Sequence, residues 1–270
     1  MSWALSVLGT LTGLPLNYSH QTSFAADSTY PVTPPVAKVS VVVCAYNEEA
    51  FIERTLRDIR SQNIIAQYPE MFEVIVVDNE STDNTAGVAS QYAKVVYAPR
   101  GKLNAKQKGI ETASGEIIVF LDADCVVGPN LLNLLLSHFR SLEVVAVSGG
   151  MFFIGNDFGY TIVSIYGNML NSILKRLMLG GVSAVRKEAF YAVGGFRTDV
   201  DQFSRDAVST EEEYGLMQKL RRYGRVVVDD RANIFTEPRY QYCAARGESC
   251  ATATDPKCQY CKEMAARQRF

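Results

Sequence analysis

Two carboxylates, Asp122 and Asp124, stand one residue apart directly after the apolar run Ile117 to Leu121. A short apolar run of this kind is typical of a buried strand, so the two acids are expected at an exposed strand end. Carboxylates at this spacing can share a hard divalent cation, which in turn neutralises phosphate oxygens. Asp-x-Asp is also common in turns and helix caps, but the position after a buried strand favours a metal site.

Polar side chains also follow two earlier apolar runs. Tyr46 and Glu48 lie in the segment 45–49, after the first run, and Asp78 follows the second. Asp78 could accept hydrogen bonds from a nucleotide base or ribose, and Tyr46 could supply an aromatic wall for a pocket. These residues therefore predict a ligand site at the same sheet edge as the two carboxylates.

Helix capping is the alternative explanation of the same segments. Asn47 precedes two glutamates, and Ser81 or Thr82 precedes Asp83. A polar cap followed by acids suits the positive end of a helix. We therefore expect a helix to start directly after each of these caps.

The elements that must position these groups alternate along the chain. Short apolar runs rich in Val and Ile predict strands, and the longer amphipathic segments between them predict helices. Strands buried on both faces and joined by helices are typical of a mostly parallel, doubly wound α/β sheet. Ligands bind beyond the carboxyl ends of such strands, where the acids are placed. The predicted strands are Val39 to Cys44, Phe72 to Val77, Lys94 to Ala98, Ile117 to Leu121 and Val144 to Val147.

Composition limits the classes of protein that the chain can belong to. Its 270 residues are 47% hydrophobic and 21% charged, which is enough for one sizeable core. The net charge of −2 provides no global basic field, so we expect no nucleic-acid partner. Residues 215–270 carry more Lys and Arg than Asp and Glu. That excess could face phosphates or lipid headgroups, and a solvated basic tail is the alternative.

Three segments outside the predicted sheet have open interpretations. Residues 3–16 are mostly apolar but too short to span a bilayer, and no Lys or Arg precedes them, so we expect a peripheral anchor or a loose extension. The apolar stretch Phe158 to Leu179 is either a core helix or an amphipathic helix that faces a membrane or an acceptor. Near the end, four cysteines could bind zinc, form disulfides or be free: Cys243, Cys250, Cys258 and Cys261.

Six short motifs follow one another between residues 38 and 240. They are VVVCAYNEE (41–49), VIVVDNESTD (74–83), GKLNAKQKG (101–109), LDAD (121–124), VGGF (193–196) and EEEYGLMQKLRRYG (211–224). In type and order they resemble the motifs of the family-2 glycosyltransferases, which have a GT-A fold with a Rossmann-like nucleotide-binding half and an acceptor half. We therefore expect a catalytic domain at 38–240, preceded by an apolar leader and proline-containing linker (1–37) and followed by a cysteine-containing basic tail (241–270).

The resemblance implies an enzyme that moves a sugar from a nucleotide-diphosphate donor to an acceptor hydroxyl. It assigns Asp124 as the principal protein ligand of Mn²⁺ or Mg²⁺, with Asp122 near the metal and the ribose. Lysines are expected at the ribose or the phosphates because breaking a sugar–phosphate bond leaves a diphosphate whose charge they stabilise. The donor-binding residues that it implies are Ala45, Tyr46, Glu48, Asp78, Lys102, Lys106 and Asp122.

A general base is needed because an acceptor hydroxyl attacks poorly while it is protonated. The family usually has Glu-Asp at the start of a helix, and here the segment is a triplet of glutamates, 211–213. Counting back from Gly224 places Glu213 at the base position, with Glu212 as the neighbouring candidate. Acids are also favoured at a helix start without any catalytic role.

Departures from the family pattern affect the substrate more than the fold. Asn79 and Glu80 stand where Asp and Gly are frequent, and Cys44 stands where Pro is frequent, so base selectivity stays open, with UDP as the first expectation. The sequence lacks a Gln-x-x-Arg-Trp motif and later membrane spans, which are features of processive synthases. We therefore expect an inverting transferase that adds single sugars.

Two other functions compete with sugar transfer. A nucleotidyltransferase that makes the nucleotide sugar would normally have a glycine-rich basic loop after the first strand, whereas residues 45–49 are acidic and glycine-free. A non-catalytic binder of nucleotide or sugar is the second alternative. The expected partners are a nucleotide-sugar donor and a glycan, lipid or protein acceptor, in the cytoplasm, with peripheral membrane contact as an option.

Overall fold

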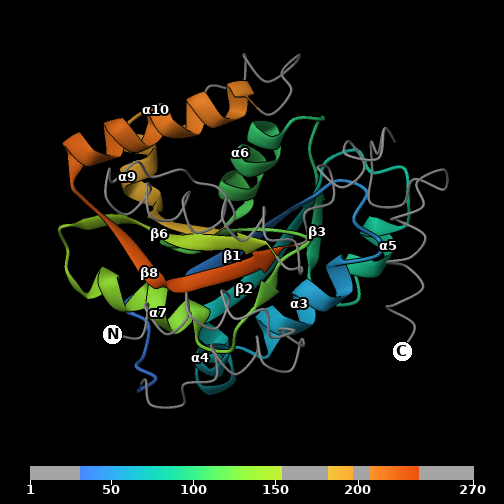
Figure 1. Ribbon diagram of the computed structural model, residues 1–270, viewed down its shortest axis with the longest axis horizontal. Helices are drawn as coiled ribbons and strands as arrows, with labels where there is room; N and C mark the ends of the chain where they lie inside the picture. Colours follow the sequence, from blue (N-terminus) through green and yellow to red (C-terminus); the bar gives the residue numbers. More distant parts are fainter. Residues whose placement is uncertain (1–30, 154–181, 197–206, 237–270) are drawn as a thin grey trace, which may run out of the picture.

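The computed structural model describes residues 31–153, 182–196 and 207–236 (Figure 1). They contain an eight-stranded sheet in the order β3-β2-β1-β4-β7-β6-β8-β5. The strands are β1 Val39–Ala45, β2 Phe72–Asp78, β3 Lys94–Tyr97, β4 Ile117–Asp122, β5 Val126–Val127, β6 Val144–Phe153, β7 Val182–Arg186 and β8 Arg225–Thr236. The α-helices are α3 Ile52–Arg60, α4 Asn63–Gln67, α5 Thr85–Ala89, α6 Lys102–Thr112, α7 Leu131–Ser137, α9 Lys187–Ala192 and α10 Ala207–Tyr223, and short 3-10 helices lie at Pro69–Met71 and His138–Arg140.

The first half of the sheet is parallel, as the apolar runs predict. β1 pairs in parallel with β2 on one side and β4 on the other, and β2 pairs in parallel with β3. All five predicted strands are confirmed, and β6 extends further than its apolar run. Val41 and Val42 are both fully buried although their side chains point to opposite faces, which explains why the run shows no polar alternation.

The second half of the sheet mixes directions. β7 pairs antiparallel with β4 and with β6, β5 pairs antiparallel with β8, and β6 runs parallel to β8. The mostly parallel doubly wound sheet is therefore confirmed in the half formed by β3, β2, β1 and β4, and antiparallel strands complete it. β5, with two residues, and β7, with five, are not among the predicted strands.

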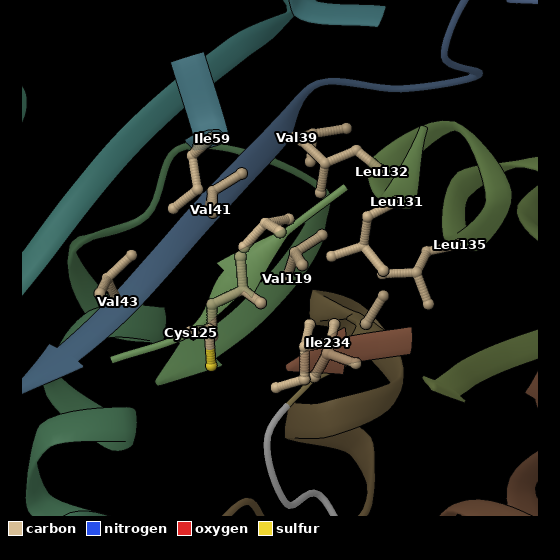
Figure 2. Packing of buried hydrophobic residues seen from close by; sticks show 14 of the residues in the cluster. Val39, Val41, Val43, Ile59, Val119, Cys125, Leu131, Leu132, Leu135 and Ile234 are labelled. Atoms are coloured by element: carbon tan, nitrogen blue, oxygen red, sulfur yellow. The ribbon is translucent and has the colours of Figure 1, made fainter. Parts of the chain in front are cut away.

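Helices cover both faces of the sheet. α6, α9 and α10 lie on one face, and α3, α4, α5 and α7 lie on the other (Figure 1). Figure 2 shows how alternate residues of β1, Val39, Val41 and Val43, meet Ile59 of α3 and Leu132 of α7 on the second face. The intervening Val42 joins the cluster under α6. The sheet is thus held rigidly between two apolar layers, with its strand ends left to carry polar groups.

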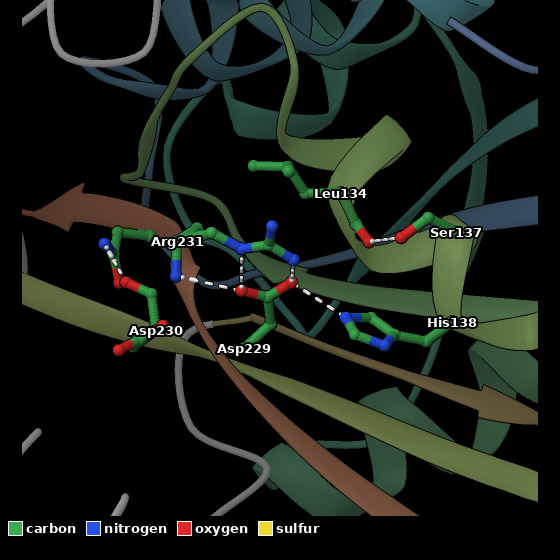
Figure 3. Close-up of polar contacts among 7 residues, drawn as sticks. Leu134, Ser137, His138, Asp229, Asp230 and Arg231 are labelled. Carbon is green, nitrogen blue, oxygen red and sulfur yellow. Dashed lines mark hydrogen bonds and ion pairs between the residues drawn. The ribbon is translucent and has the colours of Figure 1, made fainter. Parts of the chain in front are cut away.

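An irregularity in β8 is organised by a polar cluster. The register between β6 and β8 shifts between Ser148 and Gly150, and Asp229 lies in the resulting bulge. Arg231 donates to Asp229 from Nε at 2.8 Å and from Nη2 at 2.7 Å, and His138 Nε2 lies 2.8 Å from Asp229 Oδ2 (Figure 3). Opposite the bulge, a Cβ on Gly149 would come 1.9 Å from the carbonyl oxygen of Ala232, so only glycine fits there.

The predicted helix caps are wrong. α3 begins at Ile52 and α5 begins at Thr85, and neither helix has a side-chain hydrogen bond from its N-cap residue. Asn47 is instead buried with a φ of 52°, a left-handed conformation that Asn tolerates better than most residues. Its side chain accepts a hydrogen bond from the amide of Thr82, in the loop after β2.

Several predictions lie outside the described residues. They concern the leader, the apolar stretch 158–179 and the four cysteines near the end, and they stay predictions. Within the described ranges, no helix combines the length and the apolar character that crossing a membrane requires.

Candidate active site

The carboxyl ends of β1, β2 and β4 meet at one edge of the sheet. In the register of the strands, Ala45 is paired with Asp78, and Cys44 is paired with Asp122. The two acids that the sequence singled out therefore flank the end of β1, one on each side. The predicted gathering of polar groups at this edge is confirmed, because parallel strands present their carboxyl ends together.

The loops after β1 and β2 are tied to each other by side chains. The amide of Thr82 donates to Asn47 Oδ1 at 2.7 Å, and the amide of Asn47 donates to Ser81 Oγ at 3.0 Å. The amide of Glu48 also donates to Thr85 Oγ1 at 2.7 Å. Asn47 and Ser81 were predicted to cap helices, but each accepts a hydrogen bond from a main-chain amide of the other loop. These bonds hold the loops after β1 and β2 together as one wall of the site.

Glu49 and Asp83 complete this wall by an exchange. The amide of Glu49 donates to Asp83 Oδ2 at 3.2 Å, and the amide of Asn84 donates to Glu49 Oε2 at 3.0 Å. Asn84 is the N-cap position of α5, so Glu49 places its carboxylate at the positive end of a helix from another segment.

Asp78 has a buried carboxylate with spare hydrogen-bonding capacity. The residue is 4% exposed, and its Oδ2 accepts a long hydrogen bond, 3.4 Å, from the amide of Ser81. No described residue donates a hydrogen bond to Oδ1, which is also buried. A buried carboxylate oxygen without a donor is costly, so a ligand N–H or O–H at this position would be favoured.

Tyr46 lies at the mouth of the site against Arg100. The guanidinium carbon of Arg100 is 3.7 Å from the centroid of the Tyr46 ring, and Arg100 Nη1 donates to the Tyr46 hydroxyl. Arg100 belongs to the loop between β3 and α6. A planar cation stacked on an aromatic ring at this distance is a favourable pair, and it fixes the ring that was predicted to line the pocket.

Asp124 is held by the last described strand. Thr236 Oγ1 donates to Asp124 Oδ2 at 2.8 Å, and Arg54 Nη2 donates to the main-chain oxygen of Asp124 at 3.2 Å. The antiparallel pairing of Val126 with Phe235 brings Thr236 to this place. One oxygen of the carboxylate is thereby oriented before any ligand binds.

Asp122 and Asp124 offer oxygen ligands that suit a hard cation. In the described ranges, no three His, Cys, Asp or Glu side chains converge on a common point. Mg²⁺ typically takes one or two carboxylates from a protein and completes its shell with water and substrate phosphates. The pair of aspartates at this edge therefore fits such an ion, which would depend on the substrate and water for further ligands.

Lys102 is the exposed cation beside this pair. Its Nζ lies 4.0 Å from Asp122 Oδ1, and its side chain is 38% exposed. Lys102 begins α6, and the preceding Gly101 has a φ of 132°, a conformation that favours glycine. This turn sets the start of α6 at the sheet edge.

Lys106 and Glu213 form a buried ion pair between α6 and α10. Lys106 Nζ donates to Glu213 Oε1, and both side chains are almost completely buried. Burial raises the pKa of Glu213, but the charges of Lys106 and Lys102 outweigh it and hold the pKa below its usual value. Glu213 is thus kept ionised. Glu212 lies in the same helix, and its side chain is outside the described residues.

The sequence model described as "Glycosyl transferase family 2" matches residues 40–196, which is more than half of the 270 residues. The chain belongs to glycosyl transferase family 2. The matched region contains the three strand ends and Lys102 and Lys106 of α6, so the resemblance carried by the short motifs is confirmed.

Curated proteins of similar sequence bear glycosyltransferase names. The chain is 32% identical over 173 residues to glycosyltransferase AglE of Haloferax volcanii, covering 58% of this chain and 55% of AglE. It is 30% identical over 151 residues to the uncharacterized glycosyltransferase alr2836 of Nostoc sp., covering 53% of this chain and 45% of that protein. The chain thus spans about half the length of these curated relatives.

Solved structures share the fold of this family-2 chain. A mannosyltransferase from Pyrobaculum calidifontis, solved with GDP-Man and Mn²⁺, superposes with a TM-score of 0.60 at 24% identity, covering 90% of this chain and 70% of that one. Glucosyl-3-phosphoglycerate synthase from Mycobacterium tuberculosis, solved with Mn²⁺, UDP-glucose and phosphoglyceric acid, gives 0.55 at 20% identity, with 87% and 86% covered. The predicted GT-A fold is confirmed.

Sequence reasoning on the family-2 motifs missed two residues of the site. Arg100 contacts Tyr46 across 54 positions, and Thr236 contacts Asp124 across 112 positions. Their only signal was position, since each stands at or just beyond the carboxyl end of a strand. A contact at such a separation depends on strand order, which the motifs do not encode.

Cys44, a departure from the family pattern, lies beside Asp122 at the floor of the site. Burial raises the pKa of its thiol to about 12. The thiol is therefore neutral at physiological pH and acts as a small packing group.

Proposed function

We propose that the chain transfers a sugar from a nucleotide-diphosphate donor to an acceptor hydroxyl in a metal-dependent reaction. The observation that carries the proposal is the shared strand edge of Asp78, Asp122 and Asp124. One end of this edge offers a buried acceptor oxygen to which no described residue donates, and the other offers a pair of carboxylates. A nucleoside diphosphate has a hydrogen-bond donor at one end and phosphates at the other, so its polarity matches.

Donor recognition is assigned to the wall formed by the loops after β1 and β2. Asp78 Oδ1 would accept the ring N–H of the base, and Ala45, Tyr46 and Glu48 would line the pocket. We favour UDP, while GDP is the nucleotide in one of the similar structures. Both bases present a ring N–H to a carboxylate, so Asp78 alone does not separate them.

Stabilisation of the departing diphosphate is assigned to side chains that follow β4 and to the start of α6. Asp124, together with Asp122, would hold Mn²⁺ or Mg²⁺, which supplies positive charge to the departing diphosphate. Lys102 adds a second positive charge at the same edge, and the amides at the start of α6 favour an anion there. This charge stabilises the products of sugar–phosphate cleavage more than the donor.

Glu213 is assigned as the general base that takes the proton of the acceptor hydroxyl. The ion pair with Lys106 keeps this carboxylate in the form that can accept a proton. Direct attack of the activated hydroxyl would invert the anomeric centre, and single transfers are expected. Glu212 is the alternative base. The acceptor is a glycan, lipid or protein, and a cytoplasmic site of action with peripheral membrane contact stays a prediction of the sequence.

A donor screen by thermal unfolding tests this function. The protein is heated with UDP-, GDP- and dTDP-sugars, each with Mn²⁺ or with EDTA. A ligand at about 100 times its Kd adds about 2.7 kcal/mol to the free energy of unfolding, which raises Tm by several degrees. We expect UDP-sugars with Mn²⁺ to give the largest shift, and Asp78→Asn to reduce it. The absence of any metal-dependent shift with all three nucleotides would contradict the proposal.

Nucleotide release separates catalysis from the two rival functions. A transferase releases UDP from a UDP-sugar when an acceptor is supplied. A nucleotidyltransferase would instead form UDP-sugar from UTP and a sugar phosphate with loss of pyrophosphate. A binder would show the thermal shift without either product.

A further inference from the structure

Two lysines on one face of α6 face different partners. Lys102 and Lys106 are four residues apart in α6, so their side chains leave the helix on the same side, one turn from each other. Lys102 reaches toward Asp122, whose side chain is 31% exposed, whereas Lys106 reaches Glu213, which is buried. The resemblance to family 2 assigned both lysines alike to the ribose or phosphates. Their surroundings distinguish them.

Lys106 is enclosed together with Glu213. Its side chain is 2% exposed, and its Nζ lies 5.7 Å from the centroid of the Phe120 ring in addition to its contact with Glu213. If Lys106 moved out to a phosphate, Glu213 would stay behind as a buried charge without its partner. Uncompensated buried charges are strongly destabilising, so the pair is the favoured state of both residues.

Lys102 has the access that Lys106 lacks. Its side chain is 38% exposed and stands beside the carboxylates proposed to hold the metal. The 4.0 Å separation from Asp122 is at the outer limit of an ion pair, and exposed pairs of this kind contribute little to stability, so the contact with Asp122 does not hold Lys102 away from an incoming anion.

We propose that Lys102 and Lys106 of α6 serve different halves of the reaction. Lys102 meets the donor diphosphate, and Lys106 is a positioning residue that holds Glu213 in place and fixes α10 against the donor half of the sheet. The role of Lys106 rests on the proposed function of Glu213 as the base. The role of Lys102 does not, because it concerns nucleotide binding alone.

Matched methionine variants test this division. Met keeps the length of Lys and removes the charge, and Lys108→Met, an exposed position of the same helix, is the control. Calorimetric titration with UDP and Mn²⁺, with GDP and Mn²⁺ in parallel, measures the Kd. We expect Lys102→Met to raise Kd about tenfold, the loss of one charge-assisted contact. Lys106→Met and Lys108→Met should leave Kd within about twofold, which is well under 1 kcal/mol.

Turnover measures the second half of the proposal. We expect Lys106→Met to lower kcat at least about tenfold with little change in donor KM, while Lys102→Met raises donor KM. In a Glu213→Gln background, Lys106→Met should cause no further loss of kcat, because a residue that acts only through Glu213 has nothing left to position. The double variant also removes both buried charges, so it is expected to stay folded where Lys106→Met alone could fail.

Three results would overturn the proposal. If the double variant Lys106→Met/Glu213→Gln loses UDP affinity as Lys102→Met does, Lys106 is a phosphate ligand. If the kcat of Lys106→Met equals that of the unaltered protein, Lys106 does not position a group that the reaction needs. If its loss of kcat adds fully to that of Glu213→Gln, it acts on another group. Absence of sugar transfer by the unaltered chain would instead refute the proposed function, and the Kd values would still decide the role of Lys102.

Discussion

Glu213 and Asp229 are both buried carboxylates in the second half of the chain, but their surroundings differ. Asp229 accepts three hydrogen bonds from Arg231 and pairs with His138, so both its oxygens are occupied within β8 and the helix beside it. Glu213 has one hydrogen-bonding partner among the described residues, Lys106, which comes from a segment 107 positions away in the chain.

The difference indicates two uses of a buried charge. Burial raises the pKa of Asp229, but hydrogen bonds from Arg231 and His138 outweigh it and hold the pKa well below the usual value. Both carboxylate oxygens of Asp229 are occupied by Arg231 and His138, and this cluster stabilises the bulge in β8. The charges of Lys106 and Lys102 keep Glu213 ionised, and a single hydrogen-bonding partner among the described residues leaves its carboxylate with lone pairs that can accept a proton. We therefore assign a structural role to Asp229 and the role of proton acceptor to Glu213.

The largest expected effect is on turnover by Glu213→Gln. General acid–base catalysis typically contributes about 10²–10⁴ in rate, so kcat should fall by that factor while donor binding is retained. Asp229→Asn, the matched change at the other buried carboxylate, should leave kcat within about twofold because it touches no proposed substrate group. Steady-state assays of UDP release measure both. If Glu212→Gln alone abolishes turnover, the base lies one residue earlier.

Lys106→Met should cause the largest loss of stability. Removing one partner of a buried ion pair typically costs about 3–5 kcal/mol, because the other charge stays buried without compensation. Urea unfolding of Lys106→Met and of the exposed control Lys108→Met measures the difference. Addition of Glu213→Gln to Lys106→Met should recover most of the loss. A change below about 1 kcal/mol, as at an exposed pair, would mean that the pair is hydrated.

Asp229→Asn should cost less stability than Lys106→Met. The amide keeps one acceptor oxygen for Arg231 and replaces the other with a donor, so we expect a loss of about 1–3 kcal/mol in the free energy of unfolding. Guanidinium unfolding at neutral pH provides the value. An unchanged midpoint would show that Arg231 and His138 do not need the charge of Asp229, and the contrast with Glu213 would lose its structural half.

The smallest expected effect is the pH dependence of the stability that Asp229→Asn loses. The pKa of Asp229 is lower in the folded protein than in the unfolded chain. The charge of Asp229 therefore stabilises the fold at pH values above its pKa in the unfolded chain, and this stabilisation is lost as the pH falls toward its pKa in the folded protein. The gap in unfolding free energy between the unaltered protein and Asp229→Asn should therefore be constant from neutral pH to about pH 5 and narrow below it. A gap that widens in acid would contradict the lowered pKa. Because His138 contacts the same carboxylate, the series is repeated in His138→Gln as a control.

The predictable part of the molecule is the part built from contiguous segments. Val-rich runs fixed the five strands, and acids at their ends located the edge where Asp78 and Asp122 meet, because parallel strands place their ends together. The assignments of donor, metal and base residues rest on motifs and stay proposals, but their side chains do gather around one edge and the helix above it.

The remaining contacts could not be predicted because they join distant segments. Asn47 has the composition of a cap, but tertiary structure directs its side chain to the amide of Thr82, 35 positions away. The Lys106–Glu213 pair spans 107 positions and depends on how α10 packs over α6, which periodicity does not specify. Likewise, the antiparallel β5 and β7 are defined by their partners in the sheet more than by their own residues.

Metal-dependent sugar transfer by Asp124→Ala tests the central claim most directly. UDP release from a UDP-sugar is measured for the unaltered chain and the variant, each over a range of Mn²⁺ concentrations and with EDTA. We expect the unaltered chain to lose activity in EDTA, and Asp124→Ala to lose at least about 10² in kcat/KM and most of its response to Mn²⁺. Undiminished, Mn²⁺-dependent transfer by Asp124→Ala would contradict the account.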